Sequence, residues 1–263
     1  ALVSAAAIMT MSTTAFAAEN PAEVFDRVME KNNTIQSAEI QSGVHSVILA
    51  KDVIPDGQMK VDMAMHAEMD MQDTTDLKYL AQVASSILGQ DSYSQVFYTD
   101  GYYYVDANGV KLKYPMPLEQ IISSVQTGVN TSNMESSYMK GISLNEVNGK
   151  RVLAYEANPK KLNKNVKEAL GTVMNTLGTD VNLDMNIQEM KGAYVLDDND
   201  YIIYMTNYIV YNMEVLDQPM TCITLMETEV QNPGEPVVVT LPSTDGYEDL
   251  IGLYDGVIES EVE

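Results

Sequence analysis

The segment Val61-Asp62-Met63-Ala64-Met65-His66-Ala67-Glu68-Met69-Asp70-Met71 decides the fold. Every odd position in it is apolar, and every even position except Ala64 is polar. A period of two is typical of a β-strand with one dry face and one wet face. The dry face is mostly methionine, whose flexible thioether packs against irregular apolar partners. The segment therefore predicts either a soft core or the wall of an apolar cavity, and it identifies no reaction.

The first residues are typical of the end of a secretory signal peptide. Leu2 to Phe16 is uncharged and rich in small and apolar residues, and Ala15-Phe16-Ala17 fits the small-x-small cleavage rule. We therefore expect cleavage between Ala17 and Ala18 and a mature protein that is extracellular, at the cell surface or periplasmic. No later stretch reaches the ~18–20 apolar residues that a transmembrane helix requires.

Charge and cysteine content exclude several classes of protein. The formal net charge is −23, which should repel nucleic acid and anionic membrane surfaces. The only cysteine, Cys222, lies in a strand-like segment and can form no intramolecular disulfide. We expect a monomer that binds no cofactor, no metal and no nucleic acid.

The spacing of apolar residues predicts the elements along the first half of the chain. Asn20-Pro21 should begin a helix that ends near Asn32-Asn33. Strands are expected at 36–50 and 58–72, paired as a hairpin that turns at Pro55-Asp56-Gly57. The apolar residues of 75–88, which include Leu80, Val83 and Ile87, share one face of a helix, and Gly89 should end it.

Turn signals organise the rest of the chain. Asp100-Gly101, Asn108-Gly109 and Asn148-Gly149 predict tight hairpins, because their residues tolerate positive φ. Helices are expected from Pro117 and from Pro159, the second as far as Leu177. The remaining expected strands span 181–190, 192–197, 201–214, 219–230 and 236–241.

This layout resembles the LolA/LppX-like lipoprotein-carrier class and related uncharacterised exported bacterial lipoproteins. The resemblance implies a long curved antiparallel sheet, a half-barrel with helices inside it, that binds acyl chains or other lipophiles between sheet and helices. The sequence Ala15-Phe16-Ala17-Ala18-Glu19 lacks the lipobox cysteine that many relatives carry after the signal. The features that carry the resemblance are the helix Ala22–Lys31, the methionine-rich strand, the hairpin Val96–Val105 around Asp100-Gly101, the run Tyr194–Met213 and the strand Val237–Pro242.

The methionines Met63, Met65, Met69 and Met71 allow three interpretations. They pack a core against helices, they line a binding site for a lipophile, or they bind a soft metal such as Cu(I). The metal is disfavoured, because in a strand His66 points away from all four thioethers. The sixteen tyrosines allow two interpretations, ordinary sheet residues or an aromatic platform for glycans or peptides.

Catalysis finds little support in the sequence. Neither His45 nor His66 lies in a recognised catalytic motif, and the hydrolase elbow, zinc-protease, phosphate-loop and dinucleotide motifs are absent. Asp197-Asp198-Asn199-Asp200 lacks the glycine and the closing glutamate of a calcium-binding EF-hand loop. A solvated turn fits this stretch better.

Together these observations predict an α+β protein with a strongly curved antiparallel β-sheet, a half-barrel, wrapping two or three helices. Residues 1–17 would be a partial signal peptide, 18–242 a single LolA/LppX-like domain and 243–263 an acidic tail. The predicted function is non-enzymatic binding of a lipophilic ligand. The alternative is an envelope or surface protein that docks a protein partner and has a solid core. The candidate ligand-binding residues are Met63, Met65, Met69, Met71, Leu80, Val83 and Ile87.

Overall fold

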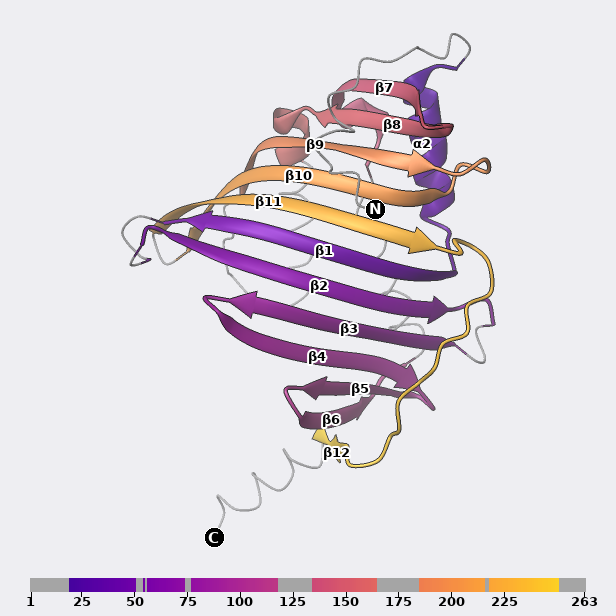
Figure 1. The fold of residues 1–263 in the computed structure, drawn as a ribbon, viewed down its shortest axis with the longest axis vertical. Coiled ribbons are helices and arrows are strands. Elements are labelled where there is room, and N and C mark those ends of the chain that lie inside the picture. The colour runs from indigo at the N-terminus through magenta and orange to yellow at the C-terminus, as the bar shows by residue number, and fades with distance from the viewer. Residues whose placement is uncertain are drawn as a thin grey trace. The chain divides into compact units, whose positions relative to one another are not determined.

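A large open β-sheet with few helices makes up the computed structural model (Figure 1). The structure describes residues 19–50, 54, 56–73, 77–117, 134–164, 185–215 and 218–250. Within these ranges twelve strands follow the order β12-β6-β5-β4-β3-β2-β1-β11-β10-β9-β8-β7. Their bounds are β1 Ser37–Leu49, β2 Gln58–Asp70, β3 Lys78–Ile87, β4 Gln90–Thr99, β5 Tyr102–Ala107, β6 Val110–Pro115, β7 Met139–Val147, β8 Lys150–Ala157, β9 Asn186–Leu196, β10 Ile202–Val215, β11 Gln218–Gln231 and β12 Glu248–Asp249.

Helices are short in the described ranges. They are α2 (Pro21–Asn32), the 3-10 turn η1 (Ser136–Tyr138) and the helical residues 159–164. None of them combines the length and the apolar composition that crossing a bilayer requires. The expected signal peptide 1–17, the helix from Pro117 and the continuation of the helix from Pro159 lie outside the described residues, so the wrapping of helices by the sheet stays a prediction.

The chain divides into two compact units. Unit 1 comprises Ala1–Asn32, Gly43–Asp62 and Ser132–Glu229, and unit 2 comprises Asn33–Ser42, Met63–Thr131 and Val230–Glu263. Each unit has hydrophobic clusters of its own.

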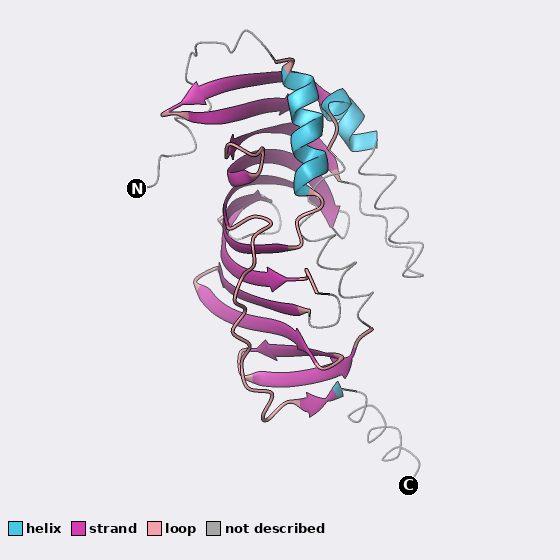
Figure 2. Cartoon of the chain, turned by 90° about the vertical axis from the view of Figure 1, so that its right-hand side faces the viewer, coloured by secondary structure: helices cyan, strands magenta, loops and turns pink. Residues whose placement is uncertain are grey.

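The core of unit 1 lies between α2 and strands β7 to β10. The helix begins as expected, because the Asn20 side chain accepts a hydrogen bond from the Ala22 N–H at 3.1 Å. Its apolar stripe of Val24, Phe25, Val28 and Met29 is buried, and Leu162 joins the same cluster. Figure 2 shows the helices in cyan beside the strands. The apolar face of the sheet in unit 1 is therefore covered by helical residues.

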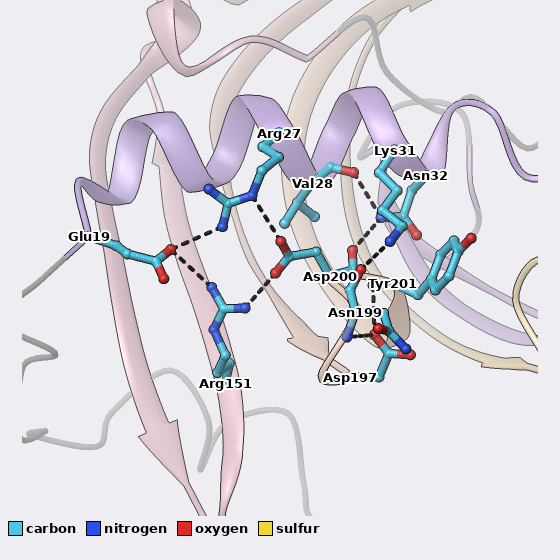
Figure 3. A network of polar contacts seen from close by, with 10 residues as sticks. All are labelled: Glu19, Arg27, Val28, Lys31, Asn32, Arg151, Asp197, Asn199, Asp200 and Tyr201. Atoms are coloured by element: carbon cyan, nitrogen blue, oxygen red, sulfur yellow. Dashed lines mark hydrogen bonds and ion pairs between the residues drawn. The ribbon is translucent and has the colours of Figure 1, made fainter.

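Ion pairs fix α2 to the turn between β9 and β10 (Figure 3). The Asp200 carboxylate accepts hydrogen bonds from Arg27 Nε at 2.9 Å and from Arg151 Nη1 at 2.5 Å. Glu19 contacts both guanidinium groups, at 3.0 and 3.3 Å. Asn32 extends the connection, since its amide donates to the Asp200 carbonyl at 3.0 Å and its oxygen accepts from the Ile202 N–H at 2.9 Å. The network orients the helix over the core.

We expect Asp200→Asn to destabilise the protein by about 1–2 kcal/mol at neutral pH. Burial alone would raise the pKa of Asp200, but the hydrogen bonds and charges of Arg27 and Arg151 lower it below its ordinary value. The stabilisation is therefore complete above the unfolded-state pKa of about 3.9 and is lost as the pH falls through the lower folded-state pKa. Urea unfolding of wild type and variant at pH 7 and at low pH measures this. A difference in stability that stayed constant with pH would contradict the expectation.

Both faces of the sheet are packed in unit 2. Ala67, Met69, Ala81 and Tyr98 form a cluster on one face. On the other face Leu80, Phe97 and Tyr104 pack against a segment that crosses the sheet, residues 232–247, which Figure 1 shows in yellow between β11 and β12.

The expected helix over 75–88 is wrong, because Lys78–Ile87 form β3, and residues 75 and 76 lie outside the described residues. Tyr79 and Ala81 pack on one face of the sheet, whereas Leu80 packs on the other with Phe97. A strand with apolar residues on both faces loses the period of two that would identify it. Leu80, Val83 and Ile87 are therefore strand residues.

Two further expectations about strands are corrected. Separate strands are expected at 181–190 and 192–197, but β9 runs unbroken from Asn186 to Leu196, and residues 181–184 lie outside the described residues. The expected strand at 236–241 belongs to the crossing segment and joins no strand of the described sheet. Its alternation arises because Val237, Val239 and Leu241 pack on the cluster around Phe97 while Val238 faces solvent.

Candidate functional site

One face of strands β2 to β6 in unit 2 carries no charged side chain, and we call it the Met–Tyr face. At its edge, strand β12 places Glu248 beside Leu112. Residues that pair across antiparallel strands lie on the same face. The register gives the rows of this face through β3, β4, β5 and β6, and the shared hydrophobic cluster adds alternate residues of β2. The rows are Tyr79–Tyr98–Tyr103–Tyr114, Ala81–Val96–Val105–Leu112, Val83–Ser94–Ala107–Val110, Ser85–Ser92 and Ile87–Gln90, beside Met63, Met65, Ala67 and Met69.

Four tyrosines form one continuous row across this face. Tyr79 pairs with Tyr98, Tyr98 with Tyr103 and Tyr103 with Tyr114. The last two rings lie 5.5 Å apart. Burial raises the pKa of Tyr103 to about 12 and also raises the pKa values of Tyr79 and Tyr114. The three phenols are therefore neutral at physiological pH and offer hydroxyl groups without introducing charge.

The methionines pass from buried to exposed along β2. Met69 and Met71 are buried, Met65 is half-buried and Met63 is 39% exposed. Met65, Met69 and Met71 pack in the cluster that contains Tyr79, Tyr98 and Tyr103. Described helices contribute no residue to this cluster, in contrast to the core of unit 1. The exposed end of the methionine row is thus open to solvent.

The structure brings six of the seven residues predicted for the ligand site to one face. Met63, Met65 and Met69 alternate along β2, Met71 joins their cluster, and Val83 and Ile87 share the face through the register of β3. Leu80 does not belong to this group, because it points to the opposite face, under the crossing segment. Sequence reasoning missed the tyrosine row, although the turns at Asp100-Gly101 and Asn108-Gly109 place Tyr103 opposite Tyr98 and Tyr114.

Histidines and carboxylates gather on the other face of the sheet. His66 Nε2 lies 3.1 Å from a Glu39 oxygen and 3.8 Å from a Glu68 oxygen. His45 pairs with Asp62 at 2.7 Å. Within the described ranges no group of three or more His, Cys, Asp or Glu is placed to hold a metal ion. The Asp197 carboxylate accepts hydrogen bonds from the backbone N–H groups of its own turn, those of Asn199 and Tyr201.

Comparison with known proteins gives a family without an assigned activity. The model of a family of unknown function (DUF6612) matches residues 20–242. No curated protein matches the chain in sequence.

Solved structures similar to this chain share little sequence with it. LprF from Mycobacterium bovis is 10% identical, with a TM-score of 0.36 and coverage of 85% of this chain and 97% of that chain. The lipoprotein LppX from Mycobacterium tuberculosis is also 10% identical, with a TM-score of 0.35 and coverage of 84% and 100%. A β-barrel-like protein of a domain of unknown function, DUF1849, from Brucella abortus is 11% identical, with a TM-score of 0.25 and coverage of 76% and 100%. The class that the sequence layout resembles thus recurs among the structural neighbours.

Proposed function

This chain belongs to the family of unknown function (DUF6612), and we propose that it binds a lipophilic ligand, an acyl chain or lipid, against the Met–Tyr face. The single observation that carries the proposal is the absence of charge from strands β2 to β6 on that face. All charged side chains of β3 to β6 lie in the rows of the opposite face, for example Asp106 and Lys111, which pair with each other there. An apolar, partly exposed surface of this kind favours a ligand that is itself uncharged where it makes contact.

The side chains of the face suit an acyl chain. Each CH₂ group that leaves water stabilises a complex by ~0.8 kcal/mol. Methionine adapts its shape to irregular apolar partners, so Met63 and Met65 can follow chains of different length and bend. The neutral tyrosine row supplies apolar ring surface and hydroxyl groups that can hydrogen bond to an ester or a glycerol oxygen.

We place the protein outside the cytoplasm and assign it no catalysis. We infer export from the apolar segment Leu2 to Phe16. His66, the histidine of β2, points away from Met65 and pairs with carboxylates instead. No histidine or carboxylate of strands β2 to β6 therefore lies on the Met–Tyr face, which favours carriage of the ligand over its conversion.

Native mass spectrometry of the chain from Ala18, purified gently from an exporting host, tests the proposal. We expect an additional mass that organic extraction identifies as a lipid, and uptake of a fluorescent fatty acid by the delipidated protein. A bare protein that also fails to take up the fatty acid would contradict the proposal. That result would favour the alternative function, docking of a protein partner.

Two lysine substitutions at neighbouring residues give a matched test of the face. Met65→Lys places a charge on the Met–Tyr face, and we expect it to weaken fatty-acid uptake by at least ~10-fold, because the ammonium group must lose water when the acyl chain binds. Ala64→Lys adds the same charge to the same strand on the opposite, exposed side. It should leave uptake unchanged. Fluorescence titration of both folded variants measures this, and equal losses in the two would refute the assignment of the face.

A further inference from the structure

Exposed apolar side chains gather at the tips of two neighbouring hairpins in unit 2. The β3–β4 and β5–β6 hairpins turn at the same end of their strands (Figure 1). Leu88 is 70% exposed, Val110 61%, and Ile87 and Tyr93 43% each. We call these four residues the hairpin-tip cluster. Large apolar residues this exposed at turns, where polar residues are usual, indicate a surface that meets something other than water.

Leu88 occupies a backbone conformation that does not favour it. The four hairpins that turn at Leu88-Gly89, Asp100-Gly101, Asn108-Gly109 and Asn148-Gly149 all have positive φ at both turn residues. Three of them carry Asp or Asn at the first position, as such turns prefer. Leucine at φ +53° in the fourth is disfavoured sterically. Burial of the side chain does not compensate for this strain, because Leu88 is among the most exposed hydrophobic side chains described.

The β5–β6 tip is hydrogen bonded to β4 of the neighbouring hairpin. The Asn108 side-chain oxygen accepts a hydrogen bond from the Tyr93 N–H at 2.8 Å, and the Asn108 N–H donates to the Tyr93 carbonyl at 2.9 Å. β3 and β4 stay paired as far as Ile87 and Gln90, so little backbone at the tip lacks a partner. A paired hairpin can therefore enter an apolar environment without exposing many free polar groups.

We propose that the hairpin-tip cluster docks the protein on the interface of a neutral, zwitterionic bilayer. Projecting side chains suit insertion between lipid headgroups, and Tyr93 has the amphipathic ring that favours this depth. Ile87 and Val110 lie at one end of the Met–Tyr face, so the docked tips adjoin the proposed acyl-chain surface. The net charge of −23 opposes anionic lipids, which sets the lipid preference. This membrane contact is additional to the ligand binding proposed above.

Leu88→Asn separates docking from folding, because asparagine suits the turn better than leucine. We expect the variant to be more stable, with a melting temperature higher by about 2–4 °C, because the strained φ is relieved. Its affinity for phosphatidylcholine vesicles should fall on the order of 10-fold, since one exposed leucine is lost. Flotation with these vesicles measures binding. The matched control is Val238→Asn, which removes an 89% exposed residue of the crossing segment and should leave flotation unchanged.

Fluorescence gives a second measurement, because the chain contains no tryptophan. Leu88→Trp should shift its emission to the blue and be quenched by brominated phosphatidylcholine, whereas Val238→Trp should show neither effect. Replacing a third of the phosphatidylcholine by phosphatidylglycerol should weaken flotation at low salt.

Three results would overturn the proposal. They are absence of wild-type flotation, flotation of Leu88→Asn equal to that of wild type, and self-association of the wild type that Leu88→Asn abolishes without any vesicle binding. Met65→Lys distinguishes this proposal from the ligand site. It should lose fatty-acid uptake and keep flotation, so failure of one proposal does not imply failure of the other.

Discussion

Gly192→Ala is expected to destabilise the protein by about 3 kcal/mol, because a methyl group has no space there. Gly192 lies in β9 between Tyr155 of β8 and Asn207 of β10, and it is paired with both. A Cβ at this position would lie 2.5 Å from the Thr206 carbonyl oxygen, 2.6 Å from Asn207 Oδ1 and 2.7 Å from the Tyr155 hydroxyl. The closest of these atoms is backbone, so the strand itself would have to move.

The absence of a side chain at Gly192 allows a hydrogen bond to form in the core of unit 1. The Tyr155 hydroxyl reaches across Gly192 and donates a hydrogen bond to Asn207 Oδ1. Both groups are buried, so their pairing removes a desolvation penalty that would otherwise be borne by each. Alanine at 192 would separate the two polar groups as well as strain the strand.

Gly141→Ala supplies the matched control in the same unit. Gly141 lies in β7, its backbone is not in the positive-φ region, and a Cβ added to it would meet no described heavy atom within 4 Å. We expect the stability of this variant to stay within about 0.5 kcal/mol of wild type. Urea unfolding followed by circular dichroism compares the two variants. Equal stability of Gly192→Ala and Gly141→Ala would show that β9 accommodates the methyl group freely.

Much of the fold could be predicted because short-range signals specify it. The helix at Asn20 is defined by its cap and apolar stripe, and α2 has the expected bounds. Asp-Gly and Asn-Gly turns fix register as well as position, so the β4–β5, β5–β6 and β7–β8 hairpins are confirmed. The pairing of β1 with β2 is confirmed in the strand order.

Long-range packing explains what the sequence did not reveal. The residues of β3 have helical spacing because the crossing segment, which lies some 160 residues later in the chain, buries Leu80 on the second face. The crossing segment in turn has the alternation of a strand without pairing as one, since it contacts the sheet through side chains. Neither contact can be recognised from nearby residues in the sequence. The spacing of apolar residues shows that they are buried, but it does not show which segment buries them.

The methionines of the candidate site could be predicted from the sequence, whereas the tyrosine row could not. Alternation along β2 identifies the methionines, because one strand is enough to define a face. The tyrosine row needs the register of four strands, and the spacing of one of them favours a helix, so Tyr79 cannot be aligned with Tyr98 from sequence. Leu80 is misplaced for the same reason, because helical spacing groups it with Val83 whereas strand alternation separates them.

Phe25→Ala is expected to destabilise the protein by about 3–5 kcal/mol, because the aromatic ring fills the centre of the core of unit 1. Phe25 is fully buried and packs against Tyr155 and Tyr194, with ring centroids 5.8 and 6.2 Å away. Phe25→Leu keeps most of the volume and should cost on the order of 1 kcal/mol. Thermal unfolding measures the stability of both variants.

Fatty-acid uptake by Phe25→Ala at low temperature, where the variant is folded, tests the location of the ligand site. Since the Met–Tyr face belongs to unit 2, uptake by the folded Phe25→Ala variant should match that of wild type. If instead the folded variant lost the fatty acid that the wild type binds, the ligand would lie under α2, and the proposed face would be wrong.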